Sequence, residues 1–156
     1  MSAVRRTDVD LLMPDFRSRL YSLEKALHDE GIPLRVFETI RSPERQGILY
    51  ARGRDPNAPD FGRIVTRAQA YQSAHQHGGA ADFAFFLDGR WSWEEPAAGM
   101  WLQFGALADK FKLERIRSER PHVEMPGPDW KSLPRGPMDY AGWLTWLAAR
   151  NRGAQS

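Results

Sequence analysis

Apolar side chains recur every three to four residues in three stretches of the chain, which predicts amphipathic helices. Residues 14–30 place apolar positions on one helical face and charged positions opposite, and Gly31 follows as a C-cap. Residues 97–111 and 140–150 have the same spacing. We expect these helices to pack their apolar faces against a core.

Shorter apolar runs predict β-strands, because β-branched and aromatic residues favour extended backbone. The clearest are residues 34–39 and 80–86, and residues 87–90 have the composition of a hairpin turn. Ile116 and residues 122–124 indicate further strands. The mixed order of helices and strands favours the α+β class.

Capping residues, proline and glycine mark where elements begin and end. Ser42 is a suitable N-cap and Pro43 a suitable first residue for a short helix that we expect to end near Gly53. Residues 54–62 are rich in Asp, Pro, Asn and Gly, which predicts an exposed irregular loop. This loop does not indicate a linker to a second domain.

Length and composition indicate one packed domain. The chain has 156 residues, of which 42% are apolar and 12% aromatic, including six Trp. These side chains supply buried area that offsets the conformational entropy lost on folding. We expect a single domain over residues 1–156, with its core within about 14–150.

The charge balance and the absence of cysteine exclude several classes of function. The chain has 22 basic and 20 acidic residues and no dense cationic block, so nucleic acid is not an expected partner. Without cysteine, any metal must take nitrogen and oxygen ligands. No stretch reaches the ~18 apolar residues of a membrane span, and the N-terminus lacks the apolar run of a signal peptide. We therefore expect a soluble product made in the cytoplasm, with no stable membrane insertion.

His75, Asp82 and His122 form a candidate metal-binding set. His75 and Asp82 are seven positions apart, with a Gly-Gly pair between them, so a turn into a strand can bring their side chains towards one point. His122 could complete the set. Two His and one carboxylate are an established catalytic zinc set that leaves a fourth position for water.

Two further residues could take part in hydrolysis. Glu119 lies three residues before His122 and could take a proton from metal-bound water. Arg41 lies at a predicted strand-to-helix turn, where it could hold a substrate carboxylate or a developing oxyanion.

Each of these residues also has an ordinary structural explanation. A single His is more often structural or exposed, Asp beside Gly commonly serves a turn, and Arg and Glu are commonly surface charges. His77 could compete as a ligand, but a position behind the metal ligands or one facing solvent fits it better, whereas His28 falls on the polar face of the first helix. Trp143 and Trp146 could face a membrane, although core packing explains them better.

The run SAHQHGGAAD at residues 73–82 resembles the Ser-x-His-x-x-Gly-x-Ala-x-Asp signature of the zinc D-alanyl-D-alanine carboxypeptidase family, and every fixed position matches. That family includes vancomycin-resistance dipeptidases and phage L-alanyl-D-glutamate endolysins. Its second signature, an acidic residue three before a His, resembles ERPH at residues 119–122. Residues 41–46, 49–54 and 64–66 resemble the endolysin branch, and the likeness extends over about residues 14–124.

The resemblance implies a role for each candidate residue. By this resemblance, His75, Asp82 and His122 would be the ligands to Zn²⁺ and Glu119 would be the general base. Arg41 would contact the substrate or the transition state, and Ser73 and Gln46 would line the substrate pocket. The resemblance also implies a small antiparallel sheet with flanking helices and zinc in a cleft on the sheet.

The activity implied is hydrolysis of the L-alanyl-D-glutamate bond of the peptidoglycan stem peptide, as in an endolysin. The alternatives are a D-alanyl-D-alanine carboxypeptidase or dipeptidase, and a non-catalytic peptidoglycan-binding or virion structural module. Residues 113–118 replace a Gly-Gly-x-Trp stretch that endolysin relatives often carry, which predicts a different pocket wall. We expect a monomer without a cell-wall-binding domain, released onto the wall during phage or prophage lysis.

Overall fold

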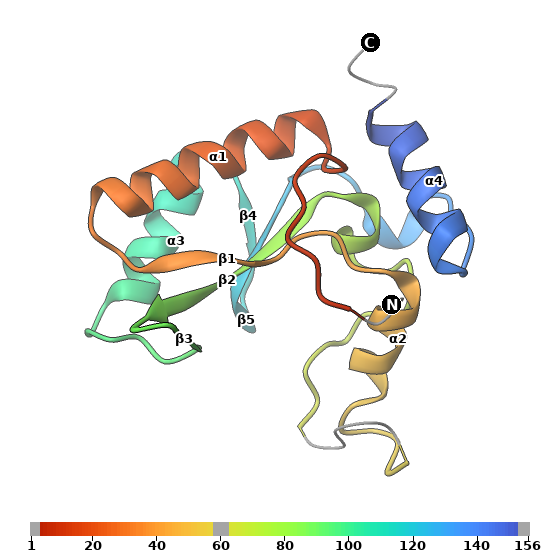
Figure 1. Ribbon diagram of the computed structural model, residues 1–156, viewed down its shortest axis with the longest axis horizontal. Coiled ribbons are helices and arrows are strands. Elements are labelled where there is room, and N and C mark those ends of the chain that lie inside the picture. Colours follow the sequence, from red (N-terminus) through yellow and green to blue (C-terminus); the bar gives the residue numbers. More distant parts are fainter. Residues whose placement is uncertain (1–3, 58–62, 153–156) are drawn as a thin grey trace.

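The computed structural model describes residues 4–57 and 63–152. These form one α+β domain with a small antiparallel sheet and flanking helices, as predicted (Figure 1). The helices are α1 (Pro14–Asp29), α2 (Pro43–Ala51), α3 (Met100–Lys110) and α4 (Tyr140–Asn151), with short 3₁₀ helices η1 (Ala74–His77) and η2 (Trp130–Ser132). The strands are β1 (Leu34–Glu38), β2 (Ala80–Leu87), β3 (Arg90–Ser92), β4 (Glu114–Ile116) and β5 (Glu119–Glu124).

The long strand β2 organises the sheet. The strand order is β1-β2-β5-β4, and β3 pairs with the far end of β2. The turn between β2 and β3 places Asp88 and Gly89 at φ 52° and 75°, the left-handed conformation that tight hairpins require. The hairpin predicted at residues 87–90 is therefore confirmed.

The core lies between the sheet and the helices α1 and α3, which run along the same side of the sheet in Figure 1. Helix α1 buries one apolar stripe, and β2 buries Phe83 and Phe85. Helix α4 packs at the other end, where Trp143 is fully buried and donates from its indole nitrogen to the Gln76 carbonyl at 3.0 Å. Core packing, rather than a membrane face, explains this residue. Among the described residues, no helix combines the length and the hydropathy needed to span a bilayer.

Several predicted boundaries are wrong by a few residues. Helix α3 begins at Met100 rather than Ala97, because Gly99 adopts φ 90° and the Glu95 carboxylate accepts from the Gly99 and Trp101 amides. Helix α2 ends at Ala51. Within the predicted loop 54–62, residues 54–57 are irregular, and residues 58–62 lie outside the described residues.

Gly78 connects the 3₁₀ helix η1 to β2 and holds the chain in a conformation that other residues disfavour. Its φ is 74°, and an added Cβ would lie 2.7 Å from the Leu11 carbonyl oxygen. We expect Gly78→Ala to lower the free energy of unfolding by about 3 kcal/mol, from left-handed strain and overpacking. Urea denaturation measures this. Gly89→Ala, at φ 75° with open space around it, should lose only about 1–2 kcal/mol, and equal losses would contradict the packing argument.

Candidate metal centre

The register of the sheet brings Asp82 and His122 together. Asp82 of β2 lies directly opposite His122 of β5, and His75 approaches from η1. One donor atom from each residue lies within 4.8 Å of the other two. We call these three residues the His–Asp–His triad. The sequence predicted their convergence, although it could not provide the strand register that produces it.

Backbone contacts fix the orientation of the His75 ring. Ser73 caps η1, with its hydroxyl accepting from the His75 amide at 3.2 Å. The ring Nδ1 lies 2.6 Å from the Thr39 carbonyl oxygen, so Nδ1 carries a proton and donates it. In the neutral ring, Nε2 is then an acceptor. It is buried, has no hydrogen-bond partner among the described residues and lies 3.3 Å from Asp82 Oδ2.

Glu124 and Trp130 orient the His122 ring from its other side. His122 Nε2 lies 2.7 Å from Glu124 Oε1, and the Trp130 indole nitrogen donates to Glu124 Oε2 at 2.8 Å. His122 Nδ1 therefore faces Asp82 Oδ1, at 3.2 Å. Burial opposes protonation of His122, but its hydrogen bonds to Asp82 and Glu124 raise its pKa to about 9. Alternation along β5 puts His122 and Glu124 on one face, a signal that the sequence interpretation missed.

Asp82 is held as a carboxylate. Burial alone would raise its pKa, but His75, His122 and Arg41 hold the pKa well below its usual range. Arg41 donates to Asp82 Oδ2 at 2.8 Å. The third member of the triad is thus an anion at neutral pH, as metal coordination requires.

The triad fits a divalent cation. His75 Nε2, the ring nitrogen that is not bonded to Thr39, lies 3.3 Å from Asp82 Oδ2, so a cation between these two atoms could bind both. Zinc bonds of 2.0–2.2 Å in a tetrahedral arrangement separate neighbouring ligand atoms by about 3.4 Å. His75 Nε2 lies 3.3 Å from Asp82 Oδ2 and His122 Nδ1 lies 3.2 Å from Asp82 Oδ1, each close to that spacing, and one ligand atom from each of the three residues lies within 4.8 Å of the others.

Glu119 lies beside the triad at the start of β5. Its Oε2 is 3.9 Å from His122 Nδ1, and its side chain is about one-third exposed, at 32%. It lines the same cleft as the triad. Its carboxylate can therefore reach solvent and a ligand bound at the triad at the same time.

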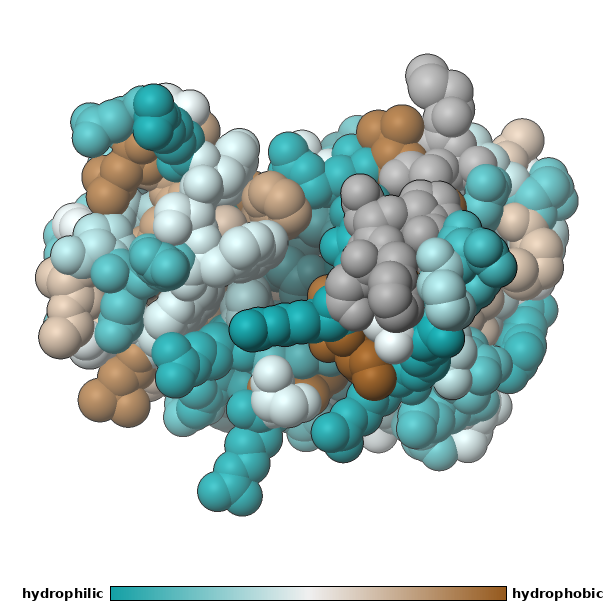
Figure 2. Space-filling model, turned by 90° about the horizontal axis from the view of Figure 1, so that it is seen from below, coloured by the Kyte–Doolittle hydropathy of each residue, from teal (hydrophilic) through white to brown (hydrophobic). Residues whose placement is uncertain are grey.

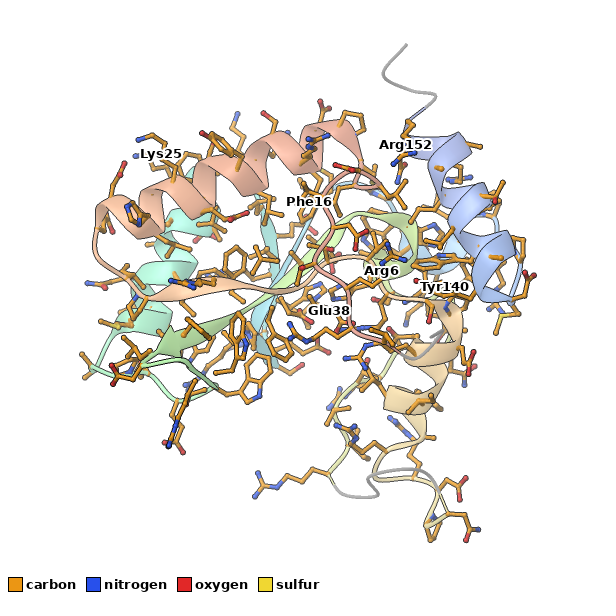
Figure 3. The ribbon with its side chains drawn as sticks, in the orientation of Figure 1. Arg6, Phe16, Lys25, Glu38, Tyr140 and Arg152 are labelled. Carbon is orange, nitrogen blue, oxygen red and sulfur yellow. The ribbon has the colours of Figure 1, made fainter. Side chains whose placement is uncertain are left out.

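Arg41 belongs to a buried polar network that the sequence interpretation did not foresee. It donates to Glu38 Oε1 at 2.7 Å and to Gln46 Oε1 at 3.0 Å, in addition to Asp82. Glu38, labelled near the centre of Figure 3, also accepts from Arg45. Gln46 is fully buried, and its amide group donates to the Ala68 carbonyl at 2.7 Å. Arg41 thus contacts the triad directly through Asp82, whereas Gln46 contacts Arg41.

The triad opens into a cleft of about 1190 Å³. Figure 2 shows this face from below, hollowed between two lobes. Ser73, Arg41 and Glu119 line the cleft, whereas Gln46 does not.

The two remaining histidines lie apart from the triad. His28 is exposed on α1, as predicted. His77 is 3% exposed and packs between the rings of Tyr71, Trp130 and Trp146, so the prediction that it could face solvent is wrong.

Comparison with known proteins identifies a relative that acts on peptidoglycan. No protein-family model matches the chain. The peptidoglycan L-alanyl-D-glutamate endopeptidase CwlK of Bacillus subtilis (strain 168) is 30% identical over 126 residues, which cover 73% of each chain. The chain therefore belongs to the family of peptidoglycan peptidases that includes this endopeptidase.

Proposed function

We propose that this chain is a zinc-dependent endopeptidase that hydrolyses the L-alanyl-D-glutamate bond of peptidoglycan stem peptides. The observation that supports it most strongly is the unpartnered His75 Nε2 facing the Asp82 carboxylate, in a relative of an enzyme with that specificity. We propose one catalytic domain that acts on the cell wall after release, in the manner of an endolysin.

In this proposal His75 binds zinc through Nε2, His122 through Nδ1 and Asp82 through its carboxylate. When bound, zinc would acidify a coordinated water and polarise the scissile carbonyl. Both His rings are held by hydrogen bonds at their other nitrogen, which keeps the ligating lone pairs aimed at one point.

Glu119 is the proposed general base. Its carboxylate takes a proton from the attacking water, whose oxygen forms a bond to the alanyl carbonyl carbon. As the C–N bond breaks, Glu119 returns that proton to the departing amine of the D-glutamyl residue. Its partial exposure and its position beside His122 support this role.

Arg41 and Ser73 are proposed to contact the substrate. Arg41 lines the cleft while paired with Glu38 and Asp82, so its guanidinium is held rigidly at the edge of the triad. The Ser73 hydroxyl lies at the start of η1, on the same cleft. Gln46 is proposed to act through Arg41, which it contacts from the buried side.

Digestion of defined muropeptides followed by mass spectrometry tests the scissile bond. The proposal predicts products cut between L-alanine and D-glutamate. Release of D-alanine with that bond intact would instead identify a carboxypeptidase or dipeptidase. Binding to sacculi without any cleavage would identify a non-catalytic module.

Glu124 gives a second test, because it holds the Nε2 proton of His122 and contacts no proposed ligand atom. Glu124→Ala should weaken zinc binding by about 10- to 100-fold, measured by competition with a chelator. Glu114→Ala is the matched control, since Glu114 is exposed and lies opposite Glu124 in the sheet. Equal zinc affinity in both variants would show that the Glu124 contact does not support the ligand.

A further inference from the structure

The cleft around the triad has two walls of different chemistry. One, the aromatic wall, consists of Phe37 at the end of β1 and Trp93 just after β3. The other, the basic wall, consists of Arg63 and Arg67 in the segment after α2. In Figure 1, β3 lies at the lower left of the molecule and α2 at the lower right.

The aromatic wall is held in place although it is open to solvent. Trp93 is 50% exposed, and its ring meets Phe37 edge-on with ring centroids 4.8 Å apart. The Trp93 carbonyl accepts from the indole nitrogen of Trp101 at 3.1 Å, and Trp101 is buried against Phe85. An exposed indole braced in this way offers a rigid apolar surface to a ligand at little entropic cost.

The basic wall carries exposed cations on an anchored segment. Arg54, in the turn after α2, donates to the Thr66 carbonyl at 3.0 Å, and the buried Gln46 of α2 donates to the Ala68 carbonyl at 2.7 Å. The residues on both sides of Arg67 are therefore anchored. Arg63 and Arg67 are exposed. Among the described lining residues, Asp129 is the exposed carboxylate, and Arg120 and Lys131 are further exposed cations.

The deeper arginines contribute less positive charge to a ligand. Arg41 and Arg45 both pair with Glu38, and Arg41 also pairs with Asp82. Attraction of an anionic ligand therefore depends mainly on the exposed cations of the cleft, of which Arg63 and Arg67 form the basic wall.

We propose that this cleft binds its substrate in one direction, with the saccharide against the aromatic wall and the anionic peptide against the basic wall. This rests on the proposed function. In the stem peptide, L-alanine carries the muramyl sugar and D-glutamate follows it with a free carboxylate. A bond cut between them would lie at the triad with the sugar on one side and the carboxylate on the other. Trp93, Arg63 and Arg67 are thus specificity-determining residues.

Binding measurements with three ligands test the direction. The ligands are a disaccharide tetrapeptide with D-glutamate, the same tetrapeptide without saccharide, and the disaccharide tetrapeptide with D-isoglutamine in place of D-glutamate. Kd is measured by calorimetry on the full zinc-loaded chain carrying Glu119→Gln, so that ligands are not consumed. Trp93→Ala and the double variant R63Q/R67Q are added, with Tyr21→Ala and Arg90→Gln as exposed controls outside the cleft.

Trp93→Ala should weaken binding of both saccharide ligands about 3- to 10-fold and leave the bare tetrapeptide within about 2-fold. R63Q/R67Q should weaken both D-glutamate ligands about 10-fold, with a smaller loss for the D-isoglutamine ligand, and added salt should reduce the difference. Uniform losses across the three ligands, or none, would overturn the proposal. Because the readout is affinity, failure of the wild-type chain to cut the L-alanyl-D-glutamate bond would refute the proposed function separately.

Discussion

His122→Ala is expected to abolish hydrolysis, together with zinc binding. The substitution removes the Nδ1 atom that faces Asp82 and leaves two of the three proposed ligands. Loss of Glu124, which only orients a ligand, should weaken zinc binding by about 10- to 100-fold. Loss of a ligand itself should weaken it by more. Zinc titration and digestion of purified sacculi measure the two effects.

A matched control separates this effect from general damage. His28→Ala makes the same chemical change on the exposed face of α1 and should leave both zinc affinity and hydrolysis unchanged. His75→Ala should reproduce the His122→Ala result from a different element, η1. A folded His122→Ala protein that still binds zinc as tightly as the wild type would exclude His122 as a ligand.

Glu119→Gln is expected to lower the hydrolysis rate by at least about 10²-fold while zinc stays bound. The amide keeps the size of the side chain but cannot take a proton from water. Because Glu119 Oε2 lies 3.9 Å from His122 Nδ1 and its side chain is partly exposed, the substitution should disturb the triad little. Turnover of a defined muropeptide and zinc content are measured on the same sample.

Glu44→Gln provides the control for that experiment, since Glu44 is exposed on α2 and does not line the cleft. Its rate should equal that of the wild type. If Glu119→Gln retained full activity, another group would have to act as the base. If it lost its zinc, Glu119 would instead be supporting the metal.

Much of the fold could be predicted because its elements carry local signals. The apolar stripe of α1, the Ser42 cap of α2 and the turn after β2 each lie within a few residues of the element they define. Helix α3 was predicted too long because its N-terminus depends on the side chain of Glu95, which lies outside the periodic stretch. Periodicity alone cannot detect such a cap.

The candidate site was predicted as a set of residues that converge, without the strand register that brings them together. The two signatures placed His75, Asp82, His122 and Glu119 in the sequence, but their proximity depends on the register of β2 against β5. Arg41 was predicted to face a substrate, and the sequence held no sign that Glu38 would pair with it.

The contacts that orient the ligands were harder still to foresee. The Thr39 carbonyl that holds His75 is a backbone group 36 residues away in sequence. Trp130 reaches Glu124 from a 3₁₀ helix that no sequence pattern predicted. These partners arise from tertiary packing, so a single sequence carries no local signal for them.

The zinc content of the purified wild-type chain shows whether His75, Asp82 and His122 hold a metal ion. We expect one zinc per chain by elemental analysis after mild purification, and a melting temperature that falls when a chelator removes the zinc and recovers when zinc is returned. A chain that carries no stoichiometric zinc, and whose melting temperature does not respond to added zinc, would contradict this expectation.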